Sequence, residues 1–307
     1  MIEYYSLKSN HDDLSISVMS VIPACPARAI LIVVHGLLGS KERFIPFMES
    51  MSSKGILCIA HDHRGHGESI KSEKDRGYMY KGGSKAMVND LRLTVEDAVS
   101  RYERLPVFIL GHSMGSMAVR SLIKQNDRYF KGVILCGSPA YTPLSQAGRI
   151  LTGLATFIGL GRIRPKMIQN MTSDMYNKRF KAEGPQAWTC SDPSVRHAFA
   201  NDPRYNFRLT INGAHALTSL IHMAYIEKNA VPVTENLPII MLQGGDDPCA
   251  GDAGSVGKSA DALRICGYEN VCTRTYPHMR HEILNETGKE NVWNDILSFI
   301  TSSQNQD

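Results

Sequence analysis

A serine stands between two glycines where an apolar run gives way to a helical pattern. In GHSMGS, Ser113 is flanked by Gly111 and Gly115, and the motif follows PVFIL and precedes MAVRSLI. A Gly-x-Ser-x-Gly turn strains the backbone, leaves room for neighbouring elements at the glycines and lifts the hydroxyl above the end of a sheet. It also places the N–H of Met114 at a helix N-terminus, which favours negative charge. The motif is short, so an incidental serine in a glycine-rich turn is the alternative interpretation.

A serine hydroxyl becomes a useful nucleophile when a base takes its proton and an acid orients that base. In a strand–turn–helix arrangement the acid and the histidine follow the serine in that order, each after a later strand. PIIMLQGGDDP supplies the acid, Asp246 or Asp247, and VCTRTYPHMRHEIL supplies the histidine, His278 or His281. Three features in the required order predict nucleophilic acyl chemistry.

Acyl transfer through a tetrahedral intermediate also needs N–H donors for the developing oxyanion. The segment VVHGLLGS follows another apolar run. The turn after Gly36 can offer the N–H of Leu37 alongside that of Met114.

The loop HDHRGHGES raises a competing possibility, a metal site. It holds three histidines and one aspartate, His61, Asp62, His63 and His66. This spacing matches no closed zinc pattern and lacks a second ligand cluster, so we expect no metal. We interpret the loop as a tight turn at Gly65 and Gly67, which Asp62 and Arg64 hold in place through hydrogen bonds.

The surrounding sequence alternates short apolar runs with helical patterns. Strands are expected at 3–7, 14–22, 29–36, 55–62, 107–113, 132–138, 238–245 and 271–277. Helices are expected at 85–105, 117–126 and 291–303. Because the later strand runs are continuously apolar, we expect parallel strands buried on both faces in an open α/β sheet.

Residues 141–209 interrupt this alternation and contain no convincing strand. We predict a helical cap there, inserted into a core made of residues 1–140 and 210–307. The cap stretch RILTGLATFIGLGRIRPK carries apolar residues near helical spacing and four cations: Ile150, Leu151, Leu154, Phe157, Ile158 and Leu160, with Arg149, Arg162, Arg164 and Lys166. Either the apolar face packs on the core, or it forms a lipid-facing lid with a basic rim. In both cases the cap would roof Ser113 and shape an apolar acyl pocket.

Composition narrows the function classes. The chain has 307 residues, 43% hydrophobic and 21% charged, which suits a globular protein with a full core. A net charge of +4 with scattered cations argues against a nucleic-acid partner. Seven widely spaced cysteines, several within apolar runs, indicate reduced thiols. With neither a signal-peptide pattern nor an apolar run of membrane-spanning length, we expect a cytoplasmic location.

Taken together, the motifs HGLLGS, HDHRGHGES, GHSMGS, LQGGDDP and YPHMRHEILNE resemble the α/β-hydrolase superfamily. They are most similar to its branch of monoacylglycerol lipases, lysophospholipases and serine aminopeptidase-like proteins. The resemblance implies an eight-stranded, mostly parallel sheet flanked by helices, with a helical cap after strand six. It also implies an esterase triad that works without a cofactor.

Carried over onto this sequence, the resemblance assigns Ser113 as the nucleophile and His281, in RHEIL, as the base. The acid is Asp247, which takes the fourth place of the branch's Gly-x-x-Asp pattern. Leu37 and Met114 would supply the oxyanion N–H donors.

The expected function is therefore hydrolysis of carboxylic esters, on single-chain lipids such as monoacylglycerols or lysophospholipids or on other small acyl esters. An aminopeptidase of the same fold is the first alternative. It would need cap carboxylates to bind the substrate ammonium, and the cap offers few, Asp174, Glu183, Asp192 and Asp202. A non-catalytic ligand-binding member is the second alternative. We expect at most transient contact with a membrane surface, through the cap.

Overall fold

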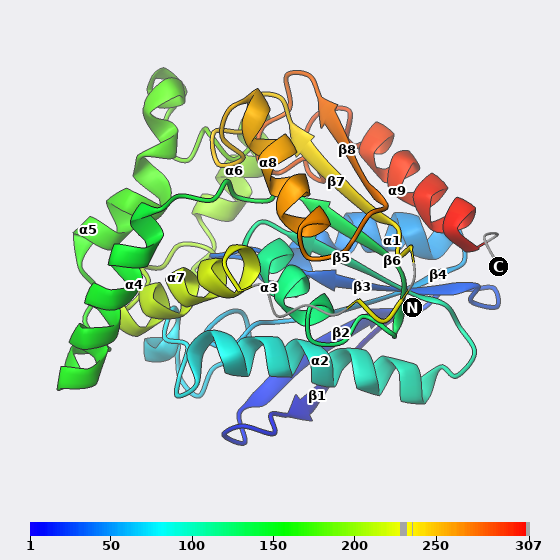
Figure 1. Ribbon diagram of the computed structural model, residues 1–307, viewed down its shortest axis with the longest axis horizontal. Coiled ribbons are helices and arrows are strands. Elements are labelled where there is room, and N and C mark those ends of the chain that lie inside the picture. The colour runs from blue at the N-terminus through cyan, green and yellow to red at the C-terminus, as the bar shows by residue number, and fades with distance from the viewer. Residues whose placement is uncertain (228–231, 235, 305–307) are drawn as a thin grey trace.

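The computed structural model describes residues 1–227, 232–234 and 236–304, and these residues form one mixed sheet flanked by helices (Figure 1). Its strands are β1 (Ile2–Lys8), β2 (Ser15–Val21), β3 (Ala29–Val34), β4 (Ile56–His61), β5 (Val107–His112), β6 (Phe130–Cys136), β7 (Ile239–Gly244) and β8 (Val271–Tyr276). Their order across the sheet is β1-β2-β4-β3-β5-β6-β7-β8. β2 pairs antiparallel with β1 and β4, whereas β3 to β8 are parallel. The predicted α/β-hydrolase sheet is confirmed.

Two layers of helices cover the sheet, one on each face. The helices of the core are α1 (Ile45–Ser53), α2 (Gly83–Arg101), α3 (Met114–Ile123), α8 (Ala253–Arg264) and α9 (Lys289–Gln304). Successive side chains of a strand point to opposite faces, so the apolar run of β3 serves both layers. Ile30 and Ile32 join the core formed with α2, α3 and α8, whereas Leu31 and Val33 join the core formed with α1 and α9.

Helical segments fill the connection between β6 and β7. They are α4 (Leu144–Ala155), α5 (Lys166–Gln169), α6 (Pro193–Ala200) and α7 (Ile211–Tyr225), with short 3₁₀ or π turns at Thr156–Leu160, Asn170–Asp174 and Tyr176–Glu183. α7 packs on α3 of the core and on α4, so it joins the inserted helices to the sheet. The boundaries of the cap at 141 and 209 stay a proposal.

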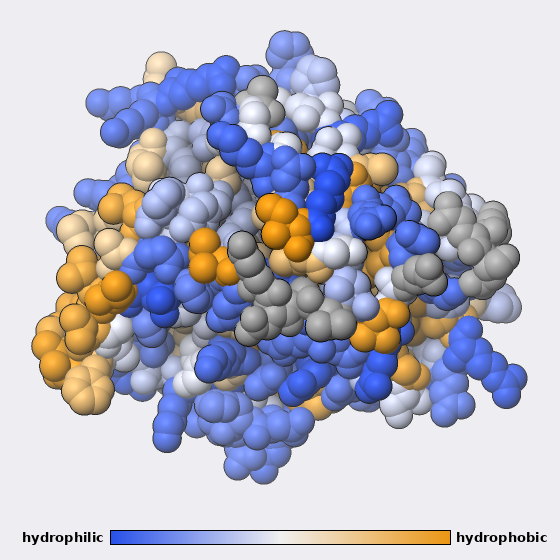
Figure 2. All heavy atoms as spheres, viewed as in Figure 1, coloured by the Kyte–Doolittle hydropathy of each residue, from blue (hydrophilic) through white to orange (hydrophobic). Residues whose placement is uncertain are grey.

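The amphipathic stretch at α4 lies with its apolar side chains outward. Ile150, Leu151, Leu154, Phe157 and Ile158 are all exposed, and the Phe157 side chain is 88% exposed. Figure 2 shows apolar side chains gathered at the left edge of the molecule, where Figure 1 places α4. The interpretation in which this stretch packs its apolar face on the core is therefore wrong.

The apolar side chains of α4 are exposed because the opposite side of this helix packs against α7. A Cβ at Gly153 would lie 2.9 Å from the Cε1 atom of His215, so the helices approach closely at this glycine. The carbonyl of Arg149 contacts Nδ1 of His215 at 3.0 Å, and Gln146 Oε1 contacts Nδ1 of His222 at 2.9 Å. Small and polar groups occupy the packed face, which leaves the large apolar side chains on the outer face.

Three further observations concern the cysteines, membrane-spanning helices and groups of metal-ligating side chains. All seven cysteines are free thiols; Cys25 and Cys272 are exposed and the other five are buried. Within the described ranges, no helix has the length and apolar character needed to cross a membrane. The same residues contain no group of three or more His, Cys, Asp or Glu side chains placed to hold a metal ion. The cytoplasmic location stays a prediction.

Candidate active site

Ser113 lies in the tight turn between β5 and α3. Its backbone has φ of 53° and ψ of −120°, a strained conformation for a residue with a side chain. Added Cβ atoms would lie 2.6 Å from the Gly115 carbonyl oxygen at Gly111 and 2.3 Å from the Val34 carbonyl oxygen at Gly115. Only glycine fits at both places, and the strained turn expected from the motif is confirmed.

The structure brings Ser113, His281 and Asp247 together. His281 Nε2 is 2.8 Å from Ser113 Oγ, and His281 Nδ1 is 2.8 Å from Asp247 Oδ2. The carboxylate accepts a hydrogen bond from Nδ1–H, which leaves Nε2 unprotonated and free to accept the serine proton. Asp247 is held in turn by the N–H of Cys249, which donates to Oδ1 at 2.8 Å.

Electrostatics tune the histidine of this cluster. Burial by itself would lower the pKa of His281, but the charge and the hydrogen bond of Asp247 outweigh it and raise the pKa above its ordinary value. A raised pKa makes the imidazole a stronger proton acceptor.

The alternative acid and base lie elsewhere. Asp246 accepts a hydrogen bond from Arg179 Nη2 at 2.7 Å in a partly exposed ion pair. His278 is exposed, with φ of 63°, in the turn after β8. Adjacent residues point in different directions, so Asp247 faces the imidazole and Asp246 does not.

A buried ion pair adjoins His281. Glu282 Oε2 accepts from Arg43 Nε at 3.2 Å, and Oε1 lies 3.1 Å from Nη2. Burial alone would raise the pKa of Glu282, but the charge of Arg43, followed by that of His112, lowers it to about 2. The guanidinium also lies 3.6 Å from the centre of the Phe199 ring.

An aromatic side chain from the inserted segment covers His281. The ring of Trp188 lies 4.9 Å from the imidazole, and the ring of Tyr176 lies 5.0 Å from that of Trp188. Both aromatic residues come from residues 141–209, whereas His281 comes from the loop after β8.

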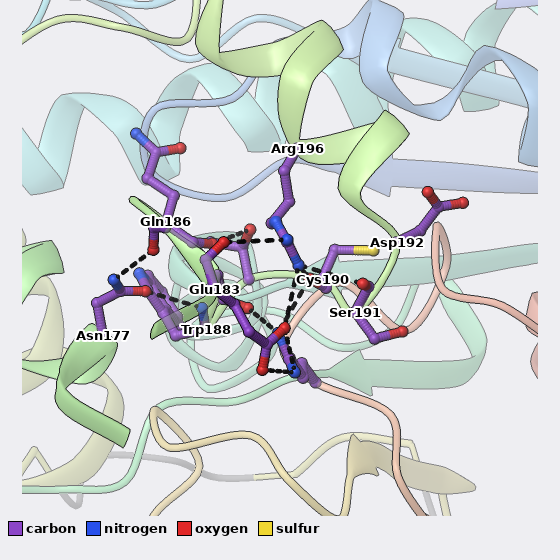
Figure 3. A network of polar contacts seen from close by, with 12 residues as sticks. Asn177, Glu183, Gln186, Trp188, Cys190, Ser191, Asp192 and Arg196 are labelled. Carbon is purple, nitrogen blue, oxygen red and sulfur yellow. Dashed lines mark hydrogen bonds and ion pairs between the residues drawn. The ribbon is translucent and has the colours of Figure 1, made fainter. Parts of the chain in front are cut away.

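Polar contacts tie this part of the insertion to the histidine loop (Figure 3). Arg280 Nη2 donates to both carboxylate oxygens of Glu183, at 2.7 and 2.9 Å, and Nη1 donates to the Ala187 carbonyl at 2.6 Å. Arg196 Nη1 donates to the carbonyl of Cys190 at 2.8 Å. The network holds residues 183–191, and therefore Trp188, against the loop that carries His281.

The turn after β3, at Gly36, packs closely against the turn that carries Ser113. A Cβ at Gly36 would lie 2.9 Å from Ser113 Cβ and 3.1 Å from His112 Nδ1, so the two backbones can approach only because residue 36 is glycine. The N–H of Leu37 donates no hydrogen bond to another residue in the described ranges. Leu37 and Met114 both line the cavity in front of Ser113.

This cavity has a volume of about 420 Å³ and contains Ser113 and His281 in its wall. Its apolar wall comes from α3, α4, α7 and the neighbouring turns: Met117, Pro139, Leu144, Met171, Met175, Leu217 and Ile221. Among the described lining residues Glu282 is the only acid. A larger, open hollow of about 750 Å³ near Arg76, Arg164 and Arg208 contains neither Ser113 nor His281.

Sequence reasoning missed Trp188, Arg43 and Glu282. Glu282 follows His281 directly in RHEIL, so the sequence itself indicates a charged residue next to the base. Nothing in the local pattern of Arg43 or Trp188 indicates that either approaches His281, because both come from distant segments.

Comparisons with known proteins identify the family and the fold of this chain. Residues 25–288 match the family model described as serine aminopeptidase, S33. A monoacylglycerol lipase of Mycolicibacterium smegmatis is 26% identical, covering 97% of this chain and 98% of the relative. A monoglyceride lipase of Rattus norvegicus is 26% identical, covering 88% of this chain and 84% of the relative. The crystal structure of a thermostable carboxyl esterase from Bacillus coagulans in complex with glycerol superposes with a TM-score of 0.87 at 25% identity, covering 98% of both chains.

Proposed function

Because this chain belongs to the serine aminopeptidase S33 family and is a serine ester hydrolase, we propose that it hydrolyses single-chain lipid esters, such as monoacylglycerols or lysophospholipids, with Ser113, His281 and Asp247 as its triad. The observation that carries the proposal is the line of contacts from Asp247 through His281 to Ser113, each 2.8 Å, at the wall of an apolar cavity.

The geometry supports a two-step acyl transfer. Ser113 Oγ attacks the ester carbonyl while His281 Nε2 takes its proton, and Asp247 stabilises the resulting imidazolium. The N–H groups of Leu37 and Met114 bind the oxyanion of the tetrahedral intermediate. His281 then gives the proton to the departing alcohol. In the second step water, deprotonated by His281, attacks the acyl-enzyme, and the carboxylic acid leaves as Ser113 recovers its proton.

The charges around the cavity favour esters over aminoacyl amides. An aminopeptidase needs a free carboxylate near the serine to bind the substrate ammonium. Glu282, the acid that lines the described cavity wall, is already paired with Arg43. Three of the four acids of the insertion are also engaged: Glu183 binds Arg280, Asp202 binds Arg204, and Asp192 accepts from the Ser194 N–H.

The apolar wall predicts a preference for acyl-chain length. Each buried methylene contributes about 0.8 kcal/mol, so kcat/KM should rise about fourfold per methylene until the cavity is full. Glyceryl and p-nitrophenyl esters of increasing length, beside a panel of aminoacyl naphthylamides, measure this preference. A flat ester series with good amide turnover would favour the aminopeptidase.

The role of the serine is tested by its removal. Ser113→Ala should lower kcat by about a million-fold while the chain stays folded, because alanine loses only the hydroxyl. Wild-type protein should react with a fluorophosphonate probe and the variant should not. Absence of labelling in both would support a non-catalytic ligand-binding protein.

The exposed apolar face suggests how a lipid substrate arrives. Residues 141–173 contain four cations and no acid. Lys166, the first residue of α5 after the apolar face, is exposed, whereas Arg162 is paired with Asp75. We propose that the outer face of α4 and of the following turn contacts an anionic lipid surface transiently, with its apolar side chains in the acyl region. Binding to phosphatidylglycerol vesicles, weaker to phosphatidylcholine vesicles, is the expected result.

A further inference from the structure

A cluster of histidines lies beside the turn after β3, which carries Gly36 and Leu37, and takes no part in the mechanism above. Four imidazoles lie within it, all almost completely buried: His35, His61, His63 and His66. The rings of His35 and His63 are 4.4 Å apart, and those of His35 and His66 are 5.4 Å apart. The sequence pattern suggested no more than a turn at residues 61–69, whereas the structure packs this loop against His35, the residue before Gly36.

Backbone groups determine which nitrogen of each ring carries the proton. The N–H of His63 donates to His35 Nε2 at 2.9 Å, so that nitrogen has no proton. His35 Nδ1 therefore carries the proton and donates to the Gly36 carbonyl at 2.7 Å. His63 Nε2, 3.1 Å from the His35 carbonyl, can only donate to it. His63 Nδ1 is left to accept from His61 Nε2, 3.3 Å away.

This arrangement requires a neutral ring at His35. A proton on His35 Nε2 would face the N–H of His63, and two donors cannot bond to each other. Burial is the main cause that lowers the pKa of His35 and of His63 well below the ordinary value, and the neighbouring histidines lower both further. Both rings are accordingly neutral at the pH where His281 acts as a base.

The carbonyl that His35 holds belongs to the peptide that carries the oxyanion donor. The peptide unit is planar and trans, so the Gly36 carbonyl and the Leu37 N–H point in opposite directions. Fixing the oxygen therefore fixes the direction of the N–H. The Gly39 N–H also donates to this oxygen, at the longer distance of 3.2 Å. The next residue, Leu38, has φ of 54°, a strained conformation that the surrounding contacts must maintain.

We propose that His35, held in one tautomer by the backbone of His63, is a positioning residue that aims the Leu37 N–H at the oxyanion. The proposal rests on the function proposed above. His35 touches no reacting atom; it acts through the orientation of the Gly36–Leu37 peptide. Its effect should appear in the transition state and not in the binding of the ester.

Substitutions separate this role from simple packing. His35→Leu removes the donor, whereas His35→Asn places an amide N–H near the position of Nδ1. Loss of an oxyanion donor lowers kcat by about 10²- to 10³-fold, so a misaimed donor in His35→Leu should lower it by about 10- to 100-fold with little change in KM. His35→Asn should recover a large part of kcat. His66→Leu is the matched control, because His66 is equally buried and also packs against the His35 ring, but its hydrogen bond goes to the Arg64 carbonyl and not to the Gly36–Leu37 peptide.

An alkylboronic acid, which forms a tetrahedral adduct with serine, gives a second readout. Its inhibition constant should rise in His35→Leu in proportion to the loss of kcat, and stay near the wild-type value in His66→Leu. Equal effects of the two leucine variants, or a KM that rises as kcat falls, would show that His35 only packs.

Nitrogen-15 NMR of the histidines in the wild-type protein provides a test that needs no folded variant. A ring with a protonated Nδ1 and an unprotonated Nε2 is expected at His35, and the opposite tautomer would overturn the proposal. If the wild type hydrolysed no ester, the proposed function would fail, while the tautomer of His35 would still be measurable.

Discussion

Replacement of Phe157 by serine tests the proposed contact between the insertion and a lipid surface. Phe157 lies in the turn after α4, is 88% exposed and does not line the cavity. Complete burial of a phenylalanine side chain contributes about 1.5–3 kcal/mol, and nearly all of that gain is still available to this residue. Phe157→Ser should therefore weaken vesicle binding by about 2 kcal/mol, or about 30-fold.

The assay is co-sedimentation with sucrose-loaded phosphatidylglycerol vesicles. Ile265→Ser is the matched control, because Ile265 is 69% exposed but follows α8, outside the apolar face. Lys166→Gln should weaken binding by about 1 kcal/mol, or about fivefold, with anionic vesicles only. Hydrolysis of p-nitrophenyl butyrate, a small water-soluble ester, should be unchanged in Phe157→Ser.

Two results would refute this reasoning. The first is equal vesicle binding by wild type, Phe157→Ser and Ile265→Ser. The second is a concentration-dependent dimer in sedimentation velocity that Phe157→Ser abolishes, which would assign the apolar face to contact between two copies of the chain.

Further predictions concern the charges around His281. Asp247→Asn should lower kcat by about 10⁴-fold, because the imidazole loses the acceptor that sets its tautomer, while Asp246→Asn should stay near wild type in the same ester assay. Since Asp247 raises the pKa of His281, the acid limb of kcat/KM in Asp247→Asn should move to lower pH, which a pH profile of the residual activity measures. Glu282→Gln should lower the free energy of unfolding by about 3 kcal/mol at neutral pH, because the pKa of Glu282 falls from 4.5 to about 2 beside Arg43 and the variant leaves that cation buried without its partner. A lowered pKa stabilises the fold above pH 4.5 and less as the pH falls toward 2, so urea denaturation should show the difference between wild type and Glu282→Gln shrinking over that range.

Local pattern was enough to predict the sheet and the position of the serine. All eight runs are found as strands: those of β3, β4 and β5 are apolar and buried on both faces, whereas the edge strands β1 and β8 leave most side chains exposed. Gly111 and Gly115 were informative for a related reason. Their neighbours approach to distances at which no side chain fits, so the turn around Ser113 dictates residue types that can be read directly.

The choice between adjacent candidates depended on more than local pattern. Asp246 and Asp247 are equivalent by residue type, and the resemblance to a family supplied the preference. In the structure the direction of each side chain at the end of β7 separates them, since Asp247 faces His281 and Asp246 faces Arg179.

Contacts between segments far apart in the sequence could not be predicted before the fold was known. Trp188 reaches His281, and Arg43 reaches Glu282 across 239 positions of sequence. His35 Nε2 likewise accepts from the backbone N–H of His63, 28 positions further along the chain. Such pairs leave no periodic pattern in the sequence, because each residue is compatible with its own helix or loop whether or not its partner is near.

The exposed face of α4 is the clearest case. The existence of an apolar face follows from the residue pattern, since helical spacing places Ile150, Leu151 and Leu154 close together. Whether that face is buried depends on which side of the helix fits the partner. Close approach at Gly153 and polar contacts to α7 occupy the other side, so the large apolar side chains stay outside. A hydrophobic pattern therefore specifies a surface that needs an apolar environment, and only packing decides whether the protein core supplies it.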